Sequence, residues 1–224
     1  MIYLNISRRS FLKWMLGIGI TAAASGAIIN NLLNTAKQSV TKMLPPGQYE
    51  VNSLTVLNEG PIPSSDKATW TLEVYGLVDK ELTLNFDEFR KIPAVMNVSD
   101  FHCVTGWSKL GNKWEGVRFR DIMNMVGAQT AAIYATIECE NDFTTQLMVA
   151  DLSKDDVLLA YRLDDSELSA EHGGPLRLVI PEKYGYKSAK WVRKIKFTDK
   201  LELGFWESRG YSNTADPSKN DRYS

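Results

Sequence analysis

The chain has 224 residues and a formal net charge of −1, which excludes the strong basic field that nucleic-acid-binding proteins use. Hydrophobic residues make up 44% of the chain and charged residues 24%, the ordinary balance of a globular protein with a sizeable core. A chain of this length forms one large domain or two small ones, and we expect no nucleic-acid partner.

Residues 1–29 are predicted to be an export signal and not part of the fold. Residues 7–13 read Ser-Arg-Arg-Ser-Phe-Leu-Lys, a twin-arginine signal, and an apolar run follows over 14–29. The twin-arginine translocase carries proteins that are already folded, usually because a cofactor is inserted in the cytoplasm. We therefore expect a location in the periplasm or at the outer face of the cytoplasmic membrane. A Sec signal or a membrane anchor is the alternative.

The fate of this segment after export is open. Small residues at 22–27 would suit a cleavage site. The apolar run is shorter than the roughly 20 residues of a stable membrane span, but retention as an N-terminal anchor stays an alternative. Residues 30–66 are predicted to be a linker and an N-terminal arm, because Pro-Pro-Gly at 45–47 and Pro-Ile-Pro at 61–63 exclude a regular helix there.

Residues 67–224 are predicted to form the folded domain. A capped short helix is expected at 85–90, an amphipathic helix closed by Gly127 at 119–127, and a helical turn at 150–153. Strands are expected at 69–76, 82–84, 95–104, 132–140, 143–149, 157–161, 176–180 and 191–197. Many short strands without a regular βαβ rhythm predict a mixed α+β fold.

Cys103 is one of only two cysteines and lies in residues 101–108, which read Phe-His-Cys-Val-Thr-Gly-Trp-Ser. A thiolate on a rigid, partly apolar segment is a ligand for a metal that prefers soft donors. Two other interpretations stand beside this one. Most lone cysteines are small buried hydrophobic residues, and in an exported chain a disulfide between Cys103 and Cys139 is arithmetically possible.

Two later motifs change the weight of these interpretations. Residues 172–181 read His-Gly-Gly-Pro-Leu-Arg-Leu-Val-Ile-Pro, and residues 184–192 read Tyr-Gly-Tyr-Lys-Ser-Ala-Lys-Trp-Val. With the Cys103 segment before them, they resemble the sulfite oxidase family of molybdopterin enzymes, from about residue 68 to about residue 200. The branch is similar to the short exported bacterial kind that includes the catalytic subunit of the periplasmic methionine-sulfoxide reductase.

The resemblance implies the sulfite oxidase-type molybdopterin-binding core fold. Larger members carry an immunoglobulin-like second domain, for which the sequence after residues 204–211 has no counterpart, so we expect a single catalytic domain. The cofactor would be molybdenum-molybdopterin (Mo-MPT). Cys103 would be the catalytic residue and the single protein thiolate on the metal. The residues that would hold the phosphate of the pterin are Arg177, Ser188 and Lys190, together with the backbone amide of Ala189.

The resemblance gives several other residues a place near the cofactor. His172 would face the pterin, although the reductase branch has Asn there. Cys139 stands where that branch has Thr near the metal, so it is either a pocket-lining, cofactor-binding residue or inert packing. Asn58 lies where relatives wrap an arm against the cofactor. His102 would tune the thiolate or serve as a core residue, and Tyr161 would lie at the pocket edge or in a buried strand.

The resemblance also implies two-electron oxygen-atom transfer. Sulfite is a dianion and requires several cations around the metal, whereas the segment after Cys103 is apolar and aromatic. The nearest cations in sequence are Lys109, Lys113 and Arg118. This favours a small-molecule or methionine-sulfoxide-type substrate, an S-oxide or an N-oxide. Sulfite oxidation is the alternative, and a non-catalytic exported binding module on the same fold is another.

Electron transfer is predicted to need a separate partner. The sequence has no Cys-x-x-Cys-His haem motif and no set of cysteines for an iron–sulfur cluster. Electrons must therefore enter or leave through a second protein. In the reductase branch that protein is a membrane haem subunit, and we expect a similar partner here.

Overall fold

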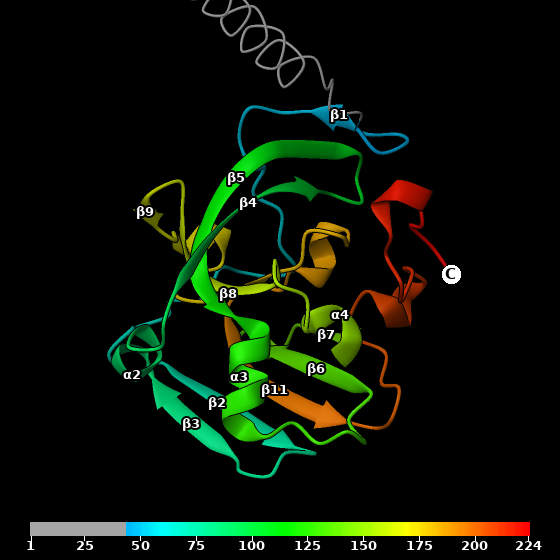
Figure 1. The fold of residues 1–224 in the computed structure, drawn as a ribbon. Coiled ribbons are helices and arrows are strands. Elements are labelled where there is room, and N and C mark those ends of the chain that lie inside the picture. Colours follow the sequence, from blue (N-terminus) through cyan, green and yellow to red (C-terminus); the bar gives the residue numbers. More distant parts are fainter. Residues whose placement is uncertain (1–43) are drawn as a thin grey trace, which may run out of the picture. The chain divides into compact units, whose positions relative to one another are not determined.

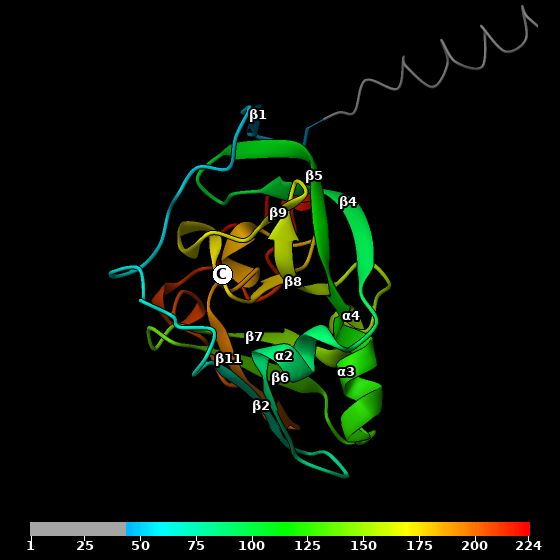
Figure 2. The same ribbon diagram turned by 90° about the vertical axis from the view of Figure 1, so that its left-hand side faces the viewer.

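The computed structural model describes residues 44–224, in which eleven strands form two sheets (Figures 1 and 2). The first sheet contains β1 (Tyr49–Glu50), β4 (Val95–His102), β5 (Trp107–Arg118), β8 (Leu158–Leu163), β9 (Ser166–Glu167) and β10 (Arg177–Val179). Its order is β1-β5-β8-β10, with β4 paired to β5 and β9 paired to β8. The predicted export segment lies outside the described residues.

The second sheet contains β2 (Thr71–Gly76), β3 (Leu82–Asn85), β6 (Tyr134–Cys139), β7 (Thr144–Met148) and β11 (Val192–Thr198), in the order β3-β2-β11-β6-β7. Strand β11 runs parallel to β2 and antiparallel to β6. Alternation in β2 buries Leu72 and Val74 in the larger core cluster. A mixture of parallel and antiparallel pairs with few helices confirms the predicted α+β class, whereas the predicted domain boundaries stay predictions.

Short helices connect the strands. They are α2 (Phe86–Arg90), α3 (Phe119–Val126) and α4 (Val149–Leu152), with single 3₁₀ turns at η1 (Ala170–His172), η2 (Gly185–Lys187), η3 (Glu207–Arg209) and η4 (Pro217–Lys219). Within residues 44–224, no helix is long and apolar enough to cross a membrane.

Helices α2 and α3 form where the sequence predicts them. Asn85 caps α2 in a reciprocal arrangement with Glu88, because each side chain accepts the backbone N–H of the other residue. Helix α3 ends at Gly127, whose φ of 62° is the left-handed conformation that glycine adopts without strain. The start of α2 and the end of α3 are therefore set by residues next to them in the sequence.

Strand β5 is the longest strand among the described residues, and the sequence did not predict it. Charged side chains at Lys109, Lys113 and Glu115 interrupt any apolar alternation. The pairing of β5 with β8 is shifted by one residue just before Gly116. A Cβ at Gly116 would lie only 2.2 Å from the carbonyl oxygen of Leu159, so the close approach of the two strands requires glycine.

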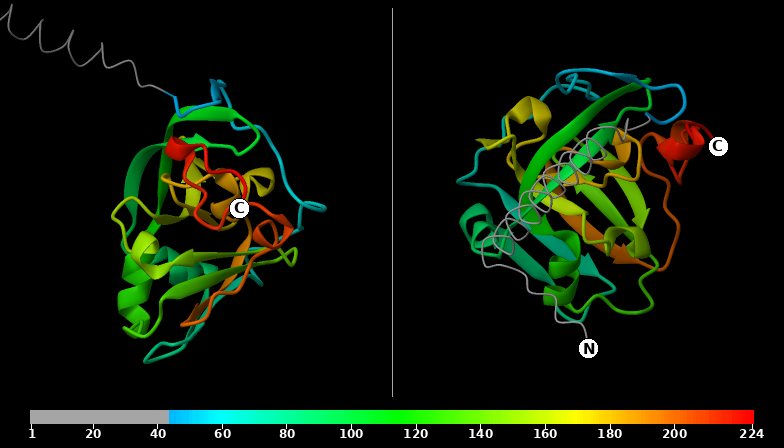
Figure 3. Two further views of the ribbon diagram at one scale, coloured as in Figure 1. Left: turned by 90° about the vertical axis from the view of Figure 1, so that its right-hand side faces the viewer. Right: turned by 45° about the horizontal axis from the view of Figure 1, so that its top comes forward.

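Strands β4 and β5 hold the Cys103 turn between them. The N–H of Cys103 donates to the carbonyl of Trp107 at 2.8 Å, and the N–H of Gly106 donates to the carbonyl of Cys103 at 3.0 Å. Both ends of the described chain reach this turn. Gln48 donates from its amide to the Cys103 carbonyl at 3.0 Å, and Arg222 donates to the Val104 carbonyl. Figure 3 shows the C-terminal segment, in red, beside the tip of β4 and β5.

Candidate cofactor-binding site

A cavity of about 350 Å³ lies between the Cys103 turn, the arm, and the segments around β10 and η2. Six of the seven residues predicted to bind the cofactor line it: Cys103, His172, Arg177, Ser188, Ala189 and Lys190. These residues come from parts of the chain about 70 positions apart in sequence, and the two sheets bring them together. The arm contributes Asn58, which the resemblance also placed near the cofactor.

Cys103 is a free thiol, 9% exposed, at the wall of this cavity. Its Sγ lies 3.1 Å from the hydroxyl oxygen of Thr105. The neighbouring His102 lies with Nδ1 2.7 Å from the Ser108 hydroxyl, and that hydroxyl donates to Gln48 at 3.0 Å. The turn that presents the thiol is thus held by side chains from both the strand and the arm.

Arg177 is a buried cation that forms no ion pair within residues 44–224. Its guanidinium donates to the carbonyls of His172 at 2.9 Å and Ser188 at 3.0 Å, and lies against the rings of Phe101 and Trp114. Burial lowers the pKa of Arg177 to about 10. A buried charge without a counter-charge is costly, so the cavity is built to receive an anion beside Arg177.

Lys190 adds a second cation to the same wall. Its ammonium donates to the carbonyls of Glu171 at 2.6 Å and Leu57 at 3.0 Å. Burial, and then the charge of Arg177, lower the pKa of Lys190 to about 8. Burial, followed by the charges of Arg177 and Lys190, also lowers the pKa of His172. The imidazole is therefore neutral at neutral pH, while Arg177 keeps its charge.

Backbone groups complete the anion-binding side of the cavity. The Ala189 carbonyl accepts from Leu178 at 2.8 Å, but the Ala189 N–H donates to no acceptor within residues 44–224. The Ser188 hydroxyl accepts from the Ile180 N–H at 3.1 Å. Close approach of the chain depends on Gly173, where a Cβ would lie 2.9 Å from the Cβ of Lys190. A free N–H next to two cations is the arrangement that binds phosphate.

Aromatic residues form another part of the lining, the aromatic wall, and the sequence did not identify them as site residues. Trp206 and Tyr211 come from the segment after β11, and their rings lie 5.1 Å apart between centroids. Tyr211 also contacts Tyr186 at 5.5 Å. Trp107 lines the cavity too, and its buried indole N–H has no hydrogen-bond partner among the described residues. Three aromatic residues within residues 205–211 are the sequence signal that could have identified this wall.

Cys139 lies elsewhere. It is on β6 in the larger core cluster, is not among the residues that line the cavity, and burial strongly raises the pKa of its thiol. This placement favours the packing interpretation over cofactor binding. Cys103 and Cys139 are both free, so the structure contains no disulfide between them. Tyr161 is likewise a core residue, with the Arg90 guanidinium 4.0 Å from its ring centroid.

The residues present fit a cofactor with a phosphate at one end and a metal at the other. The phosphate side has a buried unpaired guanidinium, an ammonium and a free backbone N–H. The metal side has one free thiol. Trp107 supplies a further buried donor without a partner within the described chain. These features together fit an anionic organic cofactor whose metal takes one thiolate ligand from the protein.

Comparison with known proteins agrees with this site. Residues 59–206 match the family model described as the oxidoreductase molybdopterin binding domain, and the chain belongs to this family. The predicted molybdopterin-dependent oxidoreductase is thereby confirmed at the level of the family.

The relatives differ in how much of their length the chain spans. YuiH of Bacillus subtilis (strain 168), an uncharacterized oxidoreductase, is 41% identical over 190 residues, which cover 84% of this chain and 96% of YuiH. The protein-methionine-sulfoxide reductase catalytic subunit MsrP of Campylobacter jejuni is 30% identical over 156 residues, 62% of this chain and 52% of MsrP. The chain therefore spans about half of MsrP.

Among solved structures, the sulfane dehydrogenase SoxCD from Paracoccus pantotrophus shares the fold. It aligns with a TM-score of 0.59 and 21% sequence identity, over 66% of this chain and 42% of that chain. At this identity the likeness concerns the fold alone.

Proposed function

We propose that the protein is an exported molybdenum-molybdopterin oxidoreductase that catalyses two-electron oxygen-atom transfer on an S-oxide or N-oxide type substrate. The observation that carries the proposal is the placement of one free thiol, Cys103, in the same cavity as Arg177 and Lys190. A single protein thiolate leaves open coordination positions on a metal, as a catalytic metal needs. The two cations and the Ala189 amide supply the phosphate site.

When bound, the molybdenum cofactor supplies the two-electron chemistry and the exchange of an oxygen atom. The residues of the chain bind and orient the cofactor. Cys103 offers its thiolate to the metal, and Thr105 places a hydroxyl 3.1 Å from that sulfur. Arg177 and Lys190 bind the phosphate. The neutral imidazole of His172 offers a hydrogen bond without adding a third charge.

The choice of substrate rests on the aromatic wall. Trp206, Tyr186 and Tyr211 present large, uncharged surfaces to the cavity, which suit a thioether or a methylated S-oxide. The cations that follow Cys103 in sequence, Lys109, Lys113 and Arg118, are not among the residues that line the cavity. The name of the relative MsrP describes a methionine-sulfoxide reductase, which supports the same substrate class.

Sulfite oxidation is the second candidate. Arg177 and Lys190 line the cavity, and a dianionic substrate would bind beside them if their charges were not neutralised by the cofactor phosphate. This candidate requires the cations to face the metal side of the site as well as the phosphate side.

A substrate assay on the exported holoenzyme distinguishes the two candidates. We expect S-oxides and N-oxides to oxidise a reduced viologen dye in the presence of the wild-type enzyme, and a Cys103→Ala variant to be inactive. Cys139→Ala is the matched control, because it removes the other buried cysteine without touching the cavity. Oxidation of sulfite, with no reduction of either oxide, would contradict the proposal and establish the second candidate.

We also propose that electrons pass through a separate partner, such as a membrane haem protein. The name of MsrP describes a catalytic subunit, which supports a partner subunit. The exported chain alone should turn over with an artificial dye but not with a natural electron donor. Turnover with a natural donor in the absence of any second protein would contradict this part of the proposal.

A further inference from the structure

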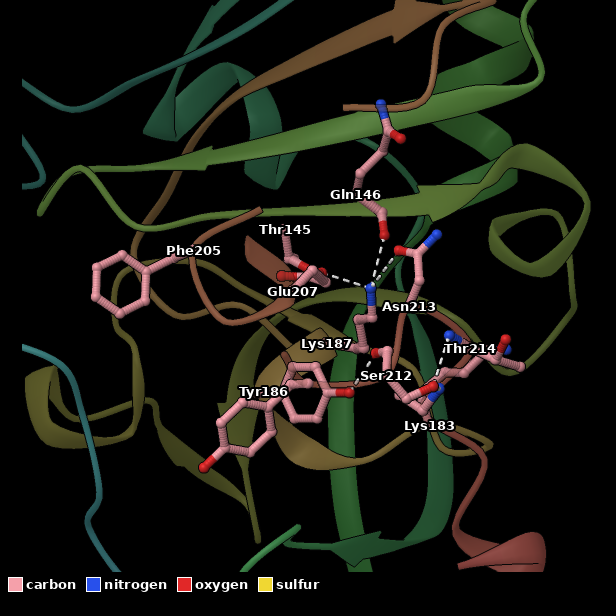
Figure 4. Close-up of polar contacts among 12 residues, drawn as sticks. Thr145, Gln146, Lys183, Tyr186, Lys187, Phe205, Glu207, Ser212, Asn213 and Thr214 are labelled. Atoms are coloured by element: carbon pink, nitrogen blue, oxygen red, sulfur yellow. Dashed lines mark hydrogen bonds and ion pairs between the residues drawn. The ribbon is translucent and has the colours of Figure 1, made fainter. Parts of the chain in front are cut away.

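A fully buried ion pair lies next to the cavity and outside the site described above. Lys187 and Glu207 are both 0% exposed at their side chains, and the Lys187 ammonium donates to Glu207 Oε1 (Figure 4). Lys187 directly precedes Ser188, Ala189 and Lys190. Neither member of the pair lines the cavity.

The Lys187 ammonium connects three separate segments. An ammonium has three N–H donors. One donates to Glu207 on η3, one to the carbonyl of Gln146 on β7 at 2.9 Å, and one to the side chain of Asn213 at 3.3 Å. Figure 4 shows all three contacts converging on one nitrogen. Thr145 donates to the same oxygen of Glu207 at 2.5 Å, which fixes the carboxylate from β7.

Stability alone does not explain such a pair. Burial lowers the pKa of Lys187, and the charge of Glu207 offsets part of that effect. Glu207 Oε2 is buried and has no hydrogen-bond partner among the described residues. Apolar residues of similar volume often replace a buried ion pair without loss of stability. The observation that bears on the role of the pair is therefore its set of contacts to three segments.

The pair joins the two walls of the cavity. On one side, Lys187 leads into the phosphate-binding segment, residues 188–190. On the other side, Glu207 lies in the sequence between Trp206 and Tyr211, which belong to the aromatic wall. A second link runs in parallel, because the Tyr186 hydroxyl donates to the Ser212 carbonyl. Displacement of either partner would therefore move both the phosphate site and the aromatic wall.

We propose that Lys187 and Glu207 are positioning residues that fix the phosphate-binding segment against the aromatic wall, so that cofactor retention and substrate binding depend on the same buried contact. This inference rests on the proposed function, since it assumes that the cavity holds the cofactor phosphate. In metal sites, removal of a partner that orients a ligand typically changes affinity or activity by about 10–100-fold, and we expect an effect of similar size here.

The test uses a double variant, Lys187→Met/Glu207→Leu, which removes both charges and leaves no unpaired ion in the core. The matched control is Lys194→Met/Glu73→Leu, which removes an ion pair of 2.8 Å that is exposed at 44% and 42%. The measurements are thermal unfolding, hydrogen exchange of residues 185–190 and 204–213 in the cofactor-free protein, and the rate of pterin release from the holoenzyme. KM and kcat for the best S-oxide or N-oxide follow.

We expect the double variant to fold, to exchange faster in both segments, and to release the pterin at least about tenfold faster, with a raised KM. The control should match the wild type in all four. A folded double variant with wild-type release and wild-type KM would overturn the inference. If the double variant does not fold, Glu207→Gln replaces it in the same assays, because glutamine keeps the side-chain volume of Glu207. Faster pterin release with a raised KM would again support the inference, and wild-type values would overturn it. A wild type without pterin overturns the proposed function instead, before any variant is compared.

Discussion

At the scale of the residue, the site depends on positive charges that the protein itself leaves uncompensated. Arg177 and Lys190 donate only to carbonyl oxygens among the described residues, and burial depresses both pKa values. For Lys190 the direction of the pH effect follows from its lowered pKa. Below about pH 8 the side chain is charged in the folded cofactor-free protein, and above it the charge is lost although an unfolded chain would still hold the proton.

Anion binding to the cofactor-free protein should therefore weaken as the pH rises through about 8, the pKa of Lys190. Sulfate is the suitable probe, because its own charge is constant over this range. Titration calorimetry between neutral and alkaline pH measures the effect, with the midpoint moved upward because a bound anion stabilises the ammonium. Lys190→Gln should bind sulfate more weakly and without this pH dependence. If the affinity of the wild type for sulfate did not change with pH over this range, the role of Lys190 would be contradicted.

The same residue would make the cofactor-free protein more stable with rising pH. A lysine whose folded pKa is depressed favours unfolding while it is charged, so the free energy of unfolding should increase between about pH 8 and the ordinary lysine value. Urea unfolding of the wild type and of Lys190→Gln, compared at each pH, measures this contribution. Identical pH profiles for the two proteins would show that Lys190 does not titrate in this window.

At the scale of the element, a helix or strand that is set by neighbouring residues could be predicted from the sequence. An element that depends on contacts between distant segments could not. Helix α2 was predictable because Asn85 and Glu88 form its cap without help from the rest of the chain. Strand β5 was not, because its charged residues hide its pairing and only contact with β4 and β8 creates it. The proposed cofactor-binding residues were identified by motif resemblance, whereas the aromatic wall depends on contacts between distant segments.

The cap of α2 gives a direct test of local stabilisation. Asn85→Ala removes the acceptor for the Glu88 N–H, and we expect a loss of about 1 kcal/mol in the free energy of unfolding. Asn85→Ser retains a capping oxygen and should lose much less. Equal losses for the two variants in urea unfolding would contradict the capping account.

The contact between β5 and β8 gives a test of close packing. Gly116→Ala would place a Cβ 2.2 Å from the Leu159 carbonyl oxygen, so the two strands must separate. We expect a loss of roughly 1–3 kcal/mol, the usual cost of overpacking, in thermal or urea unfolding. Because β5 begins directly after the Cys103 turn, cofactor content should fall as well. A fully stable variant would show that the strands tolerate the side chain.

At the scale of the whole molecule, the Cys103 turn is held by contacts that span most of the described chain. Gln48 reaches it across 55 residues and Arg222 reaches the adjacent carbonyl across 118 residues. Composition and periodicity carry no information on such contacts. Contacts of this range form only when the whole domain is folded, so folding before export would protect an inserted cofactor. This is the physical reason for the twin-arginine route that we propose.

Replacement of the twin arginines tests that route. Arg8→Lys/Arg9→Lys keeps the charge of the signal but removes the guanidinium pair, and we expect the protein to stay in the cytoplasm, folded and with its cofactor. Fractionation followed by immunoblotting measures the distribution. Unchanged export of the variant would favour the Sec signal or the anchor that the sequence left as alternatives.

The most direct test of the central claim is the molybdenum and pterin content of the protein purified after expression in a host that makes the cofactor. The account predicts stoichiometric molybdenum and pterin in the wild type and in Cys139→Ala, with molybdenum lost or greatly reduced in Cys103→Ala. A well-folded wild type that contains neither molybdenum nor pterin would contradict it, and would leave the fold as that of a binding module without redox chemistry.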